Sequence, residues 1–188
     1  MLLGIFCKMD QPRKAEQAKA HFKDKVLALQ ESIDKHLNTA ILKSDRAITQ
    51  KAFIQVRSDY KYVEYYMEYF FPSTAVMLNG APIDEIELGE NLVENPTGLQ
   101  VMEELIYDDA FAKNQAELLN EVKKMRLNLE RVLRFNEQYT LTDAQLFDAA
   151  RLEIFRITSL GISGFDTPAA LQSIPEAGSA LQGIKQLM

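Results

Sequence analysis

The chain has 188 residues, which fits one domain with a substantial hydrophobic core that needs no disulfide or metal crosslinks. Hydrophobic residues make up 47% of it, and the small numbers of glycine (8) and proline (6) favour few turns and long helices. The net charge is −6, and the acidic and basic residues are interspersed without a basic stripe. This pattern argues against nucleic-acid binding, and we predict an all-α fold.

The single cysteine, Cys7, excludes an internal disulfide, a CxxCH haem-attachment site and a multi-cysteine zinc site. It ends a short apolar run that is too short for a complete signal peptide or a membrane span. Two interpretations remain open. Residues 1–11 are a hydrophobic tail that packs or frays, or they are the end of a lipoprotein signal with Cys7 as a lipid anchor. The bulky Phe6, where a small residue is expected, speaks against the anchor.

A first long helix is predicted from Pro12 onward, because apolar residues follow at spacings of four, three, four and four: Phe22, Val26, Leu29, Ile33 and Leu37. His21 and His36 are the only histidines of the chain. Neither has a second histidine or a cysteine at ligand spacing, so we interpret both as surface or groove residues.

A second helix carries most of the aromatic residues and stops before Pro72. Its pattern continues from the first helix after Asn38-Thr39 or restarts at Ser44-Asp45. Within it, Glu64 is flanked by apolar neighbours and should be at least half buried. A buried carboxylate needs a partner, such as Arg57, a tyrosine hydroxyl such as that of Tyr60, or a metal ion.

Residues 72–95 are predicted to form one long irregular connection with turn signals at Asn79-Gly80 and Ala81-Pro82. We expect it to lie against the bundle through four apolar residues: Val76, Leu78, Ile86 and Val93. Connections of this length in compact domains are often functional.

A polar site is predicted directly after this connection. Thr97 and Gln100 have the spacing of a capping box, so a helix should begin at Thr97. In that helix Gln100 shares a face with Glu103 or Glu104, near the positive end of the helix dipole.

The remaining sequence predicts more helices. One follows Asp108-Asp109, and a capping box at Thr142 and Gln145 opens another, whose inward residues should be Phe147, Ala150, Ile154 and Ile157. Gly161 and Gly164 should end that helix. A brief helix is predicted at Thr167-Pro168 and a last one from Pro175-Glu176, which is still apolar where the sequence stops. We therefore expect residues 12–188 to be one helical-bundle domain of a longer protein.

Three segments in this order carry a family resemblance: residues 53–64, the motif Gly98-Leu99-Gln100-Val101-Met102-Glu103, and residues 161–168, which include Asp166. Together they resemble imelysin-like helical domains of bacterial cell-envelope proteins. More closely, they are similar to the helical region that precedes the haem domains in cytochrome c peroxidase-type proteins of Bacteroidetes-like bacteria. The resemblance implies a bundle of long antiparallel helices in the periplasm or cell envelope.

Imelysins are described by a GxHxxE motif that is thought to contribute metal ligands. Gly98 and Glu103 match this motif, Gln100 replaces the histidine, and Glu64 corresponds to the acidic residue of the aromatic helix. An amide oxygen is a poorer ligand than imidazole for zinc, copper or iron(II). The three residues could therefore hold a hard cation weakly or form a closed polar cluster, with Arg57, Tyr60, Glu104 and Asp166 in support.

Three functions follow as hypotheses. The first is a non-catalytic accessory domain of a dihaem peroxidase-like oxidoreductase, which packs against or orients haem c domains downstream of this chain. The alternative is a module that binds iron or another divalent cation through Glu64, Gln100 and Glu103. A plain helical scaffold is the third. The sequence has no HExxH motif, and it offers no defensible combination of nucleophile and base.

Overall fold

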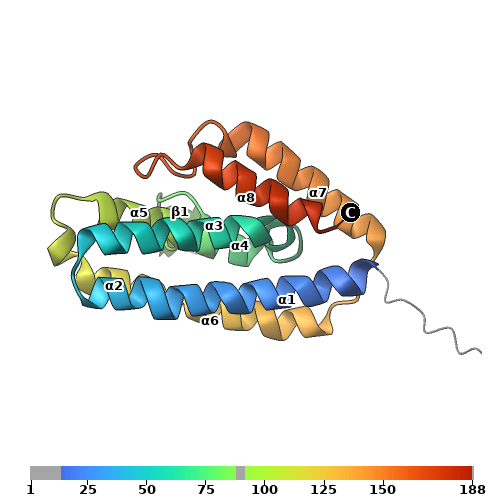
Figure 1. Ribbon diagram of the computed structural model, residues 1–188, viewed down its shortest axis with the longest axis horizontal. Helices are drawn as coiled ribbons and strands as arrows, with labels where there is room; N and C mark the ends of the chain where they lie inside the picture. The colour runs from blue at the N-terminus through green and yellow to red at the C-terminus, as the bar shows by residue number, and fades with distance from the viewer. Residues whose placement is uncertain (1–13, 88–91, 188) are drawn as a thin grey trace, which may run out of the picture.

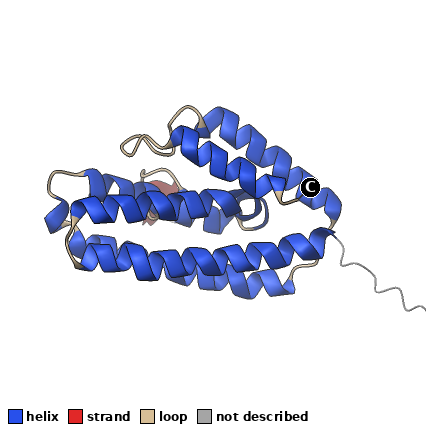
Figure 2. Cartoon of the chain, viewed as in Figure 1, coloured by secondary structure: helices blue, strands red, loops and turns tan. Residues whose placement is uncertain are grey.

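The computed structural model describes residues 14–87 and 92–187, and it confirms an all-α helical bundle (Figure 2). Cys7 and the predicted tail of residues 1–11 lie outside this part. The helices and the two short strands, in chain order, are α1 (Lys14–Ser32), η1 (Ile33–Leu37), α2 (Asn38–Leu42), α3 (Arg46–Phe70), α4 (Pro72–Asn79), β1 (Glu85–Glu87), β2 (Leu92–Glu94), α5 (Leu99–Tyr107), η2 (Phe111–Lys113), α6 (Gln115–Gln138), α7 (Asp143–Arg156), η3 (Ile157–Gly161) and α8 (Ser173–Lys185).

The first helix is one continuous rod made of α1, the π-helical turn η1 and α2. The apolar residues predicted for its inner face are fully buried. The chain restarts at Asp45, whose carboxylate accepts a hydrogen bond of 3.0 Å from the backbone N–H of Ile48 and so caps α3. The second helix therefore restarts at Ser44-Asp45, which was the second of the two predicted alternatives.

Helix α3 lies in the middle of the molecule, with α1 and α6 on one side and α7 and α8 on the other (Figure 1). Several of its aromatic residues pack toward α1, where the rings of Tyr66 and Phe22 stack with centroids 3.9 Å apart. Because neighbours cover it on both sides, even its charged residues Arg57, Lys61 and Glu64 are buried. This central position creates the site described below.

The prediction of one irregular connection over residues 72–95 is wrong. Pro72 occupies the first turn of α4, where its missing N–H costs nothing, and β1 pairs antiparallel with β2 further along. Leu78 is buried as predicted, whereas Val76 points to solvent with 48% of its surface exposed. The side chains of Ile86 and Val93 lie outside the described part.

The capping box predicted at Thr97 is also wrong, since α5 begins at Leu99. The Thr97 hydroxyl instead donates to Glu121 of α6 at 2.6 Å, and the N–H of Gly98 donates to the same carboxylate oxygen at 2.9 Å. Gly98 has a φ of +97°, and a Cβ there would overlap the carbonyl oxygen of Leu78. Glycine thus allows α5 to start against the end of α4.

The capping box at Thr142 and Gln145 is confirmed. The inward face predicted for α7 is partly wrong, however, because Phe147 and Ile154 are 71% and 50% exposed. The face that packs on the bundle carries Leu146, Ala149, Glu153 and Ile157. Helix α7 is apolar on two sides, and apolar spacing alone favoured the wrong one.

The segment between η3 and α8 forms turns, and the brief helix predicted at Thr167-Pro168 is absent from it. Gly164 has a φ of +81°, which suits the turn after η3. In the described residues, no helix has both the length and the apolar character needed to cross a membrane.

Candidate functional site

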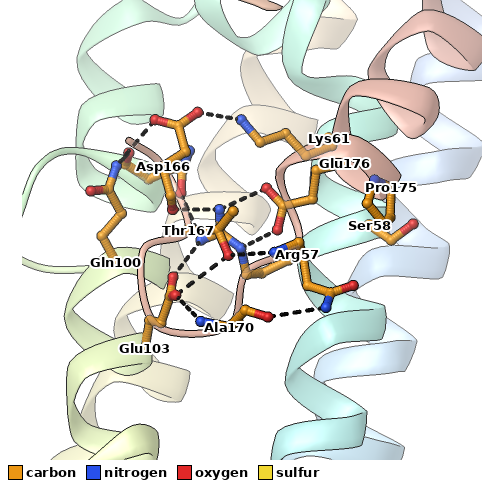
Figure 3. A network of polar contacts seen from close by, with 12 residues as sticks. Arg57, Ser58, Lys61, Gln100, Glu103, Asp166, Thr167, Ala170, Pro175 and Glu176 are labelled. Atoms are coloured by element: carbon orange, nitrogen blue, oxygen red, sulfur yellow. Dashed lines mark hydrogen bonds and ion pairs between the residues drawn. The ribbon is translucent and has the colours of Figure 1, made fainter. Parts of the chain in front are cut away.

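A charged stripe on α3 is the basis of the site. Arg57, Lys61, Glu64 and Glu68 follow at helical spacing on the side of α3 that faces α7, α8 and the 162–172 segment. Such charges are stable in a protein interior only when partners satisfy them. Partners from α5, α8 and the turn around Asp166 are drawn in Figure 3, and α7 contributes Arg156.

Arg57 is the centre of the network and is 1% exposed. It binds Glu176 of α8 in a bidentate ion pair, with Nε to Oε1 at 2.5 Å and Nη2 to Oε2 at 2.8 Å. Nη2 also donates to the backbone carbonyl of Asp166 at 2.6 Å, and Nη1 lies 3.6 Å from Oε2 of Glu103. Burial alone would lower the pKa of Arg57, but the carboxylates around it outweigh this effect and raise it.

Lys61 joins two carboxylates. Its ammonium group donates to both oxygens of Glu64, at 2.7 and 2.8 Å, and to Oδ2 of Asp166 at 2.6 Å. Here too burial opposes the charge, yet the two carboxylates raise the pKa of Lys61 above its usual range. Glu64 is buried as predicted, but its partners are Lys61 and, at 3.5 Å, Arg156. The predicted bonds from Glu64 to Arg57 or a tyrosine are wrong, because Arg57 points toward α8.

Helix α5 contributes Gln100 and Glu103, which are 5% and 1% exposed. The amide of Gln100 donates to the carbonyl of Asn79 at 3.0 Å and approaches Oδ1 of Asp166 at 3.5 Å. Oε1 of Glu103 accepts hydrogen bonds from the backbone N–H groups of Ala169 and Ala170, at 2.8 and 2.7 Å. Figure 3 shows these side chains pointing into the same interior region as Arg57.

Two predicted supporting residues play no direct part. Glu104 is exposed, so of the two glutamates only Glu103 lies on the face of Gln100. Tyr60 is fully buried beside the network, but its hydroxyl has no hydrogen-bond partner in the described chain. Burial and the nearby charges of Glu68 and Glu64 raise the pKa of Tyr60 well above its usual value.

A second group of carboxyls lies at the α7 side. Arg156 binds Glu68 at 2.9 Å, whereas Glu153 is fully buried beside Glu64. Burial, followed by the charge of Glu64, raises the pKa of Glu153 to about 10, and burial raises that of Glu68 to about 7. Glu153 is therefore a neutral acid at pH 7.

Several buried polar atoms around the network have no hydrogen-bond partner in the described part of the chain: Tyr60 Oη, Asn79 Nδ2, Glu103 Oε2 and Nε of Arg156. A cavity of about 10 Å³ lies within the network, and Lys61, Glu64 and Arg156 are among the residues that line it. This volume corresponds to about one water molecule.

The arrangement does not match a preformed metal centre. In residues 14–87 and 92–187, no three His, Cys, Asp or Glu side chains are placed to hold one metal ion. Lys61 takes both oxygens of Glu64, and backbone amides take one oxygen of Glu103. Positive charges already lie among these carboxylates, from Arg57 at Glu103 and from Lys61 and Arg156 at Glu64. In the structure Glu64, Gln100 and Glu103 belong to one network of ion pairs and hydrogen bonds.

Five members of the site were not predicted from the sequence: Lys61, Asn79, Glu153, Arg156 and Glu176. A signal for Lys61 was present, since it lies four residues after Arg57 and three before Glu64, in the stretch of helix where tyrosines stand on both sides of the apolar face. Glu153 and Glu176 likewise stand at core spacing beside buried alanines. Their pairing with α3 depends on the tertiary fold.

Comparison with known proteins does not assign a family, because no family model and no curated protein matches the chain.

Proposed function

We propose that this chain is a non-catalytic, imelysin-like helical module of a dihaem cytochrome c peroxidase-like protein in the periplasm or cell envelope. In this proposal it packs against the haem domains of that protein through α7, α8 and the segment between them. The haem groups belong to those domains, and a membrane contact would involve only a lipid anchor at Cys7. The family and the partner rest on the motifs of the sequence, and the choice of surface rests on the structure.

The observation that carries the proposal is an apolar surface on α7, the 162–172 segment and α8. Its largest side chains are 57–78% exposed: Phe147, Phe155, Phe165, Leu171 and Ile174. We call these five residues the C-terminal apolar surface. Large apolar side chains exposed on neighbouring elements of a folded domain are typical of an interface with another protein or domain.

Helical spacing supports this interpretation. Phe147 and Ile154 are seven residues apart on α7, and Ile174 and Leu181 are seven apart on α8, so each pair lies along one side of its helix. The opposite sides of both helices already pack on the bundle. Each helix thus has a second apolar side that the described chain leaves uncovered.

The buried network supports a structural role. Its guanidinium and ammonium groups are held by carboxylates of the same domain, and the cavity beside them has room for about one water molecule. The network joins α3 to α8 and to the turn before it. It therefore fixes the segments that present the C-terminal apolar surface.

The test begins with the complete reading frame, which should encode CxxCH motifs after this domain. Hydroxyl-radical footprinting then compares the isolated chain with the full-length protein. We expect labelling of Phe147 and Phe155 to fall at least fivefold in the full-length protein. Phe135 on α6, which is 45% exposed, should keep its labelling and serves as the control. A frame without CxxCH motifs, or equal labelling of both residues in the two proteins, would refute the proposal.

A divalent-cation module is the alternative proposal, and one observation favours it. Oε2 of Glu103 is buried and accepts no hydrogen bond in the described chain, so it could serve as a ligand if Arg57 moved away. Elemental analysis of protein purified without chelator tests this. Stoichiometric metal that is lost in Glu103→Ala and kept in Glu104→Ala would support the alternative, and metal-free protein would exclude it.

A further inference from the structure

A groove at the α2 end of the molecule, lined by none of the residues of the C-terminal apolar surface, has several properties of a ligand site. It has a volume of about 440 Å³ and lies between the η1–α2 segment and the first turns of α3. Its described lining residues are Lys35, His36, Thr39, Ala40, Lys43, Ile48, Lys51, Ala52 and Gln55. This volume is in the range of sites for small molecules.

The groove is basic, although the whole chain has a net charge of −6. Its described lining contains Lys35, Lys43, Lys51 and His36 but no acidic residue. Lys35 pairs with Glu31 at 2.5 Å, whereas Lys43 and Lys51 form no ion pair within the described residues. A cleft lined by charges of one sign attracts ligands of the opposite sign. Two ammonium groups are thus free to hold an anion.

The inner wall of the groove is apolar. Ala40 and Ala52 are buried at 2% and 9% exposure and form its floor, where their small side chains leave room between the two helices. Ile48 stands at the wall and is 51% exposed. A ligand with an apolar part would cover these three residues while its acidic group reached the lysines.

The backbone beside the groove is unusual. The turn Ile33–Leu37, which carries Lys35 and His36, is a π-helix inside an otherwise regular rod. Single π-helical turns are rare and occur often at functional sites. The π-helical turn is independent of the charge and the volume of the groove, and it forms part of the groove's wall.

We propose that this groove binds a small organic anion, with a phosphate or carboxylate group held between Lys43 and Lys51 and an apolar part seated on Ala40, Ala52 and Ile48. This site is separate from the buried network and does not depend on the function proposed above.

The proposal is tested with phenyl phosphate and benzoate as anionic probes and benzyl alcohol as the neutral control, followed by methyl NMR on the whole chain. We expect saturable shifts of the Ala40, Ile48 and Ala52 methyl signals with at least one anion. Phosphate and carboxylate recognition are distinguished by which probe binds. Binding should weaken when sodium chloride rises from 50 to 500 mM. No saturable shift with either anion, or equal binding of benzyl alcohol, would overturn the proposal.

Charge variants provide the matched comparison. The double variant Lys43→Gln/Lys51→Gln should raise the Kd of the bound probe at least tenfold. Lys113→Gln/Lys123→Gln removes the same charge at exposed positions outside the groove and should change it less than twofold. All four lysines are exposed, so both variants should keep the wild-type thermal midpoint within about 2 °C. Equal Kd values for the two double variants would also overturn the proposal.

Discussion

The clearest test of the buried network compares Glu103→Ala with Gln100→Ala. Both residues lie on α5 and are nearly fully buried, so the two substitutions share the same change in helix propensity. The two substitutions differ in the buried groups that lose a hydrogen-bond or ion-pair partner. Glu103 accepts from two backbone N–H groups and faces Arg57, whereas Gln100 makes one close hydrogen bond to a backbone carbonyl.

The contacts set the expected magnitudes. In Glu103→Ala the buried N–H of Ala170 loses its acceptor, the N–H of Ala169 loses a partly buried bond, and Arg57 loses one of its carboxylates, at 3.6 Å. A buried group without a partner costs roughly 1–3 kcal/mol, and breaking a buried ion pair costs more. Burial raises the pKa of Glu103, and removal of the carboxylate relieves this cost. We therefore expect a loss of about 3 kcal/mol in the free energy of unfolding.

Gln100→Ala should cost about 1 kcal/mol, the usual contribution of one neutral hydrogen bond. Urea unfolding followed by circular dichroism measures both changes. Glu104→Ala, an exposed position on the same helix, is the control and should stay within about 0.5 kcal/mol of wild type. Equal losses for Glu103→Ala and Gln100→Ala, or losses near zero for both, would show that the network does not hold α5 to the turn after Asp166.

Two more predictions concern α8 and α7. A Cβ at Gly183 would overlap the carbonyl oxygen of Tyr62, so Gly183→Ala should lower the free energy of unfolding by about 2–3 kcal/mol. Gly178→Ala, in open space on the same helix, should raise it by about 0.5–1 kcal/mol, and urea midpoints that do not separate the two variants would contradict this packing. Because the pKa of Glu153 is raised from 4.5 to about 10, the folded state keeps a proton that the unfolded state releases, and stability should fall as pH rises between these values, by up to about 1.4 kcal/mol per pH unit. Urea titrations should show that the free energy of unfolding falls less between pH 6 and pH 9 in Glu153→Gln than in the wild-type protein. An equal fall in the two proteins would mean that Glu153 is ionised in the folded protein.

Apolar spacing was a good guide to the long helices, because burial of one face dominates their packing. The spacing of Phe22, Val26 and Leu29 predicted a buried face that the structure confirms. The burial of Glu64 was also predictable, since its neighbours on α3 are apolar on both sides. Local sequence patterns gave a wrong prediction where a residue distant in the sequence bound the side chain that the pattern had assigned to a local role. Thr97 has the spacing of a helix cap, but Glu121 of α6 takes its hydroxyl instead.

The members of the network could be predicted better than their pairing. Arg57, Gln100, Glu103 and Asp166 were singled out from the sequence and lie together in the structure. The partner of Arg57 is Glu176, 119 residues further along the chain. A pairing over this separation depends on how α8 is placed on α3, and no local rule of spacing contains that information.

The buried charges also explain which side of α7 packs on the bundle. One side offers Leu146 and Ala149, and another offers Phe147 and Ile154, so apolar area alone does not distinguish them. In the observed orientation Arg156 reaches Glu68 at 2.9 Å, and Glu153 enters the interior as a neutral acid beside Glu64. If the helix turned so that Phe147 faced inward, Arg156 would leave the partly buried Glu68 without its cation and Glu64 with Lys61 as its remaining cation. Buried ion pairs add little net stability to a fold, but the loss of these contacts in the other orientation favours the observed packing. That selection leaves the aromatic side of α7 facing outward.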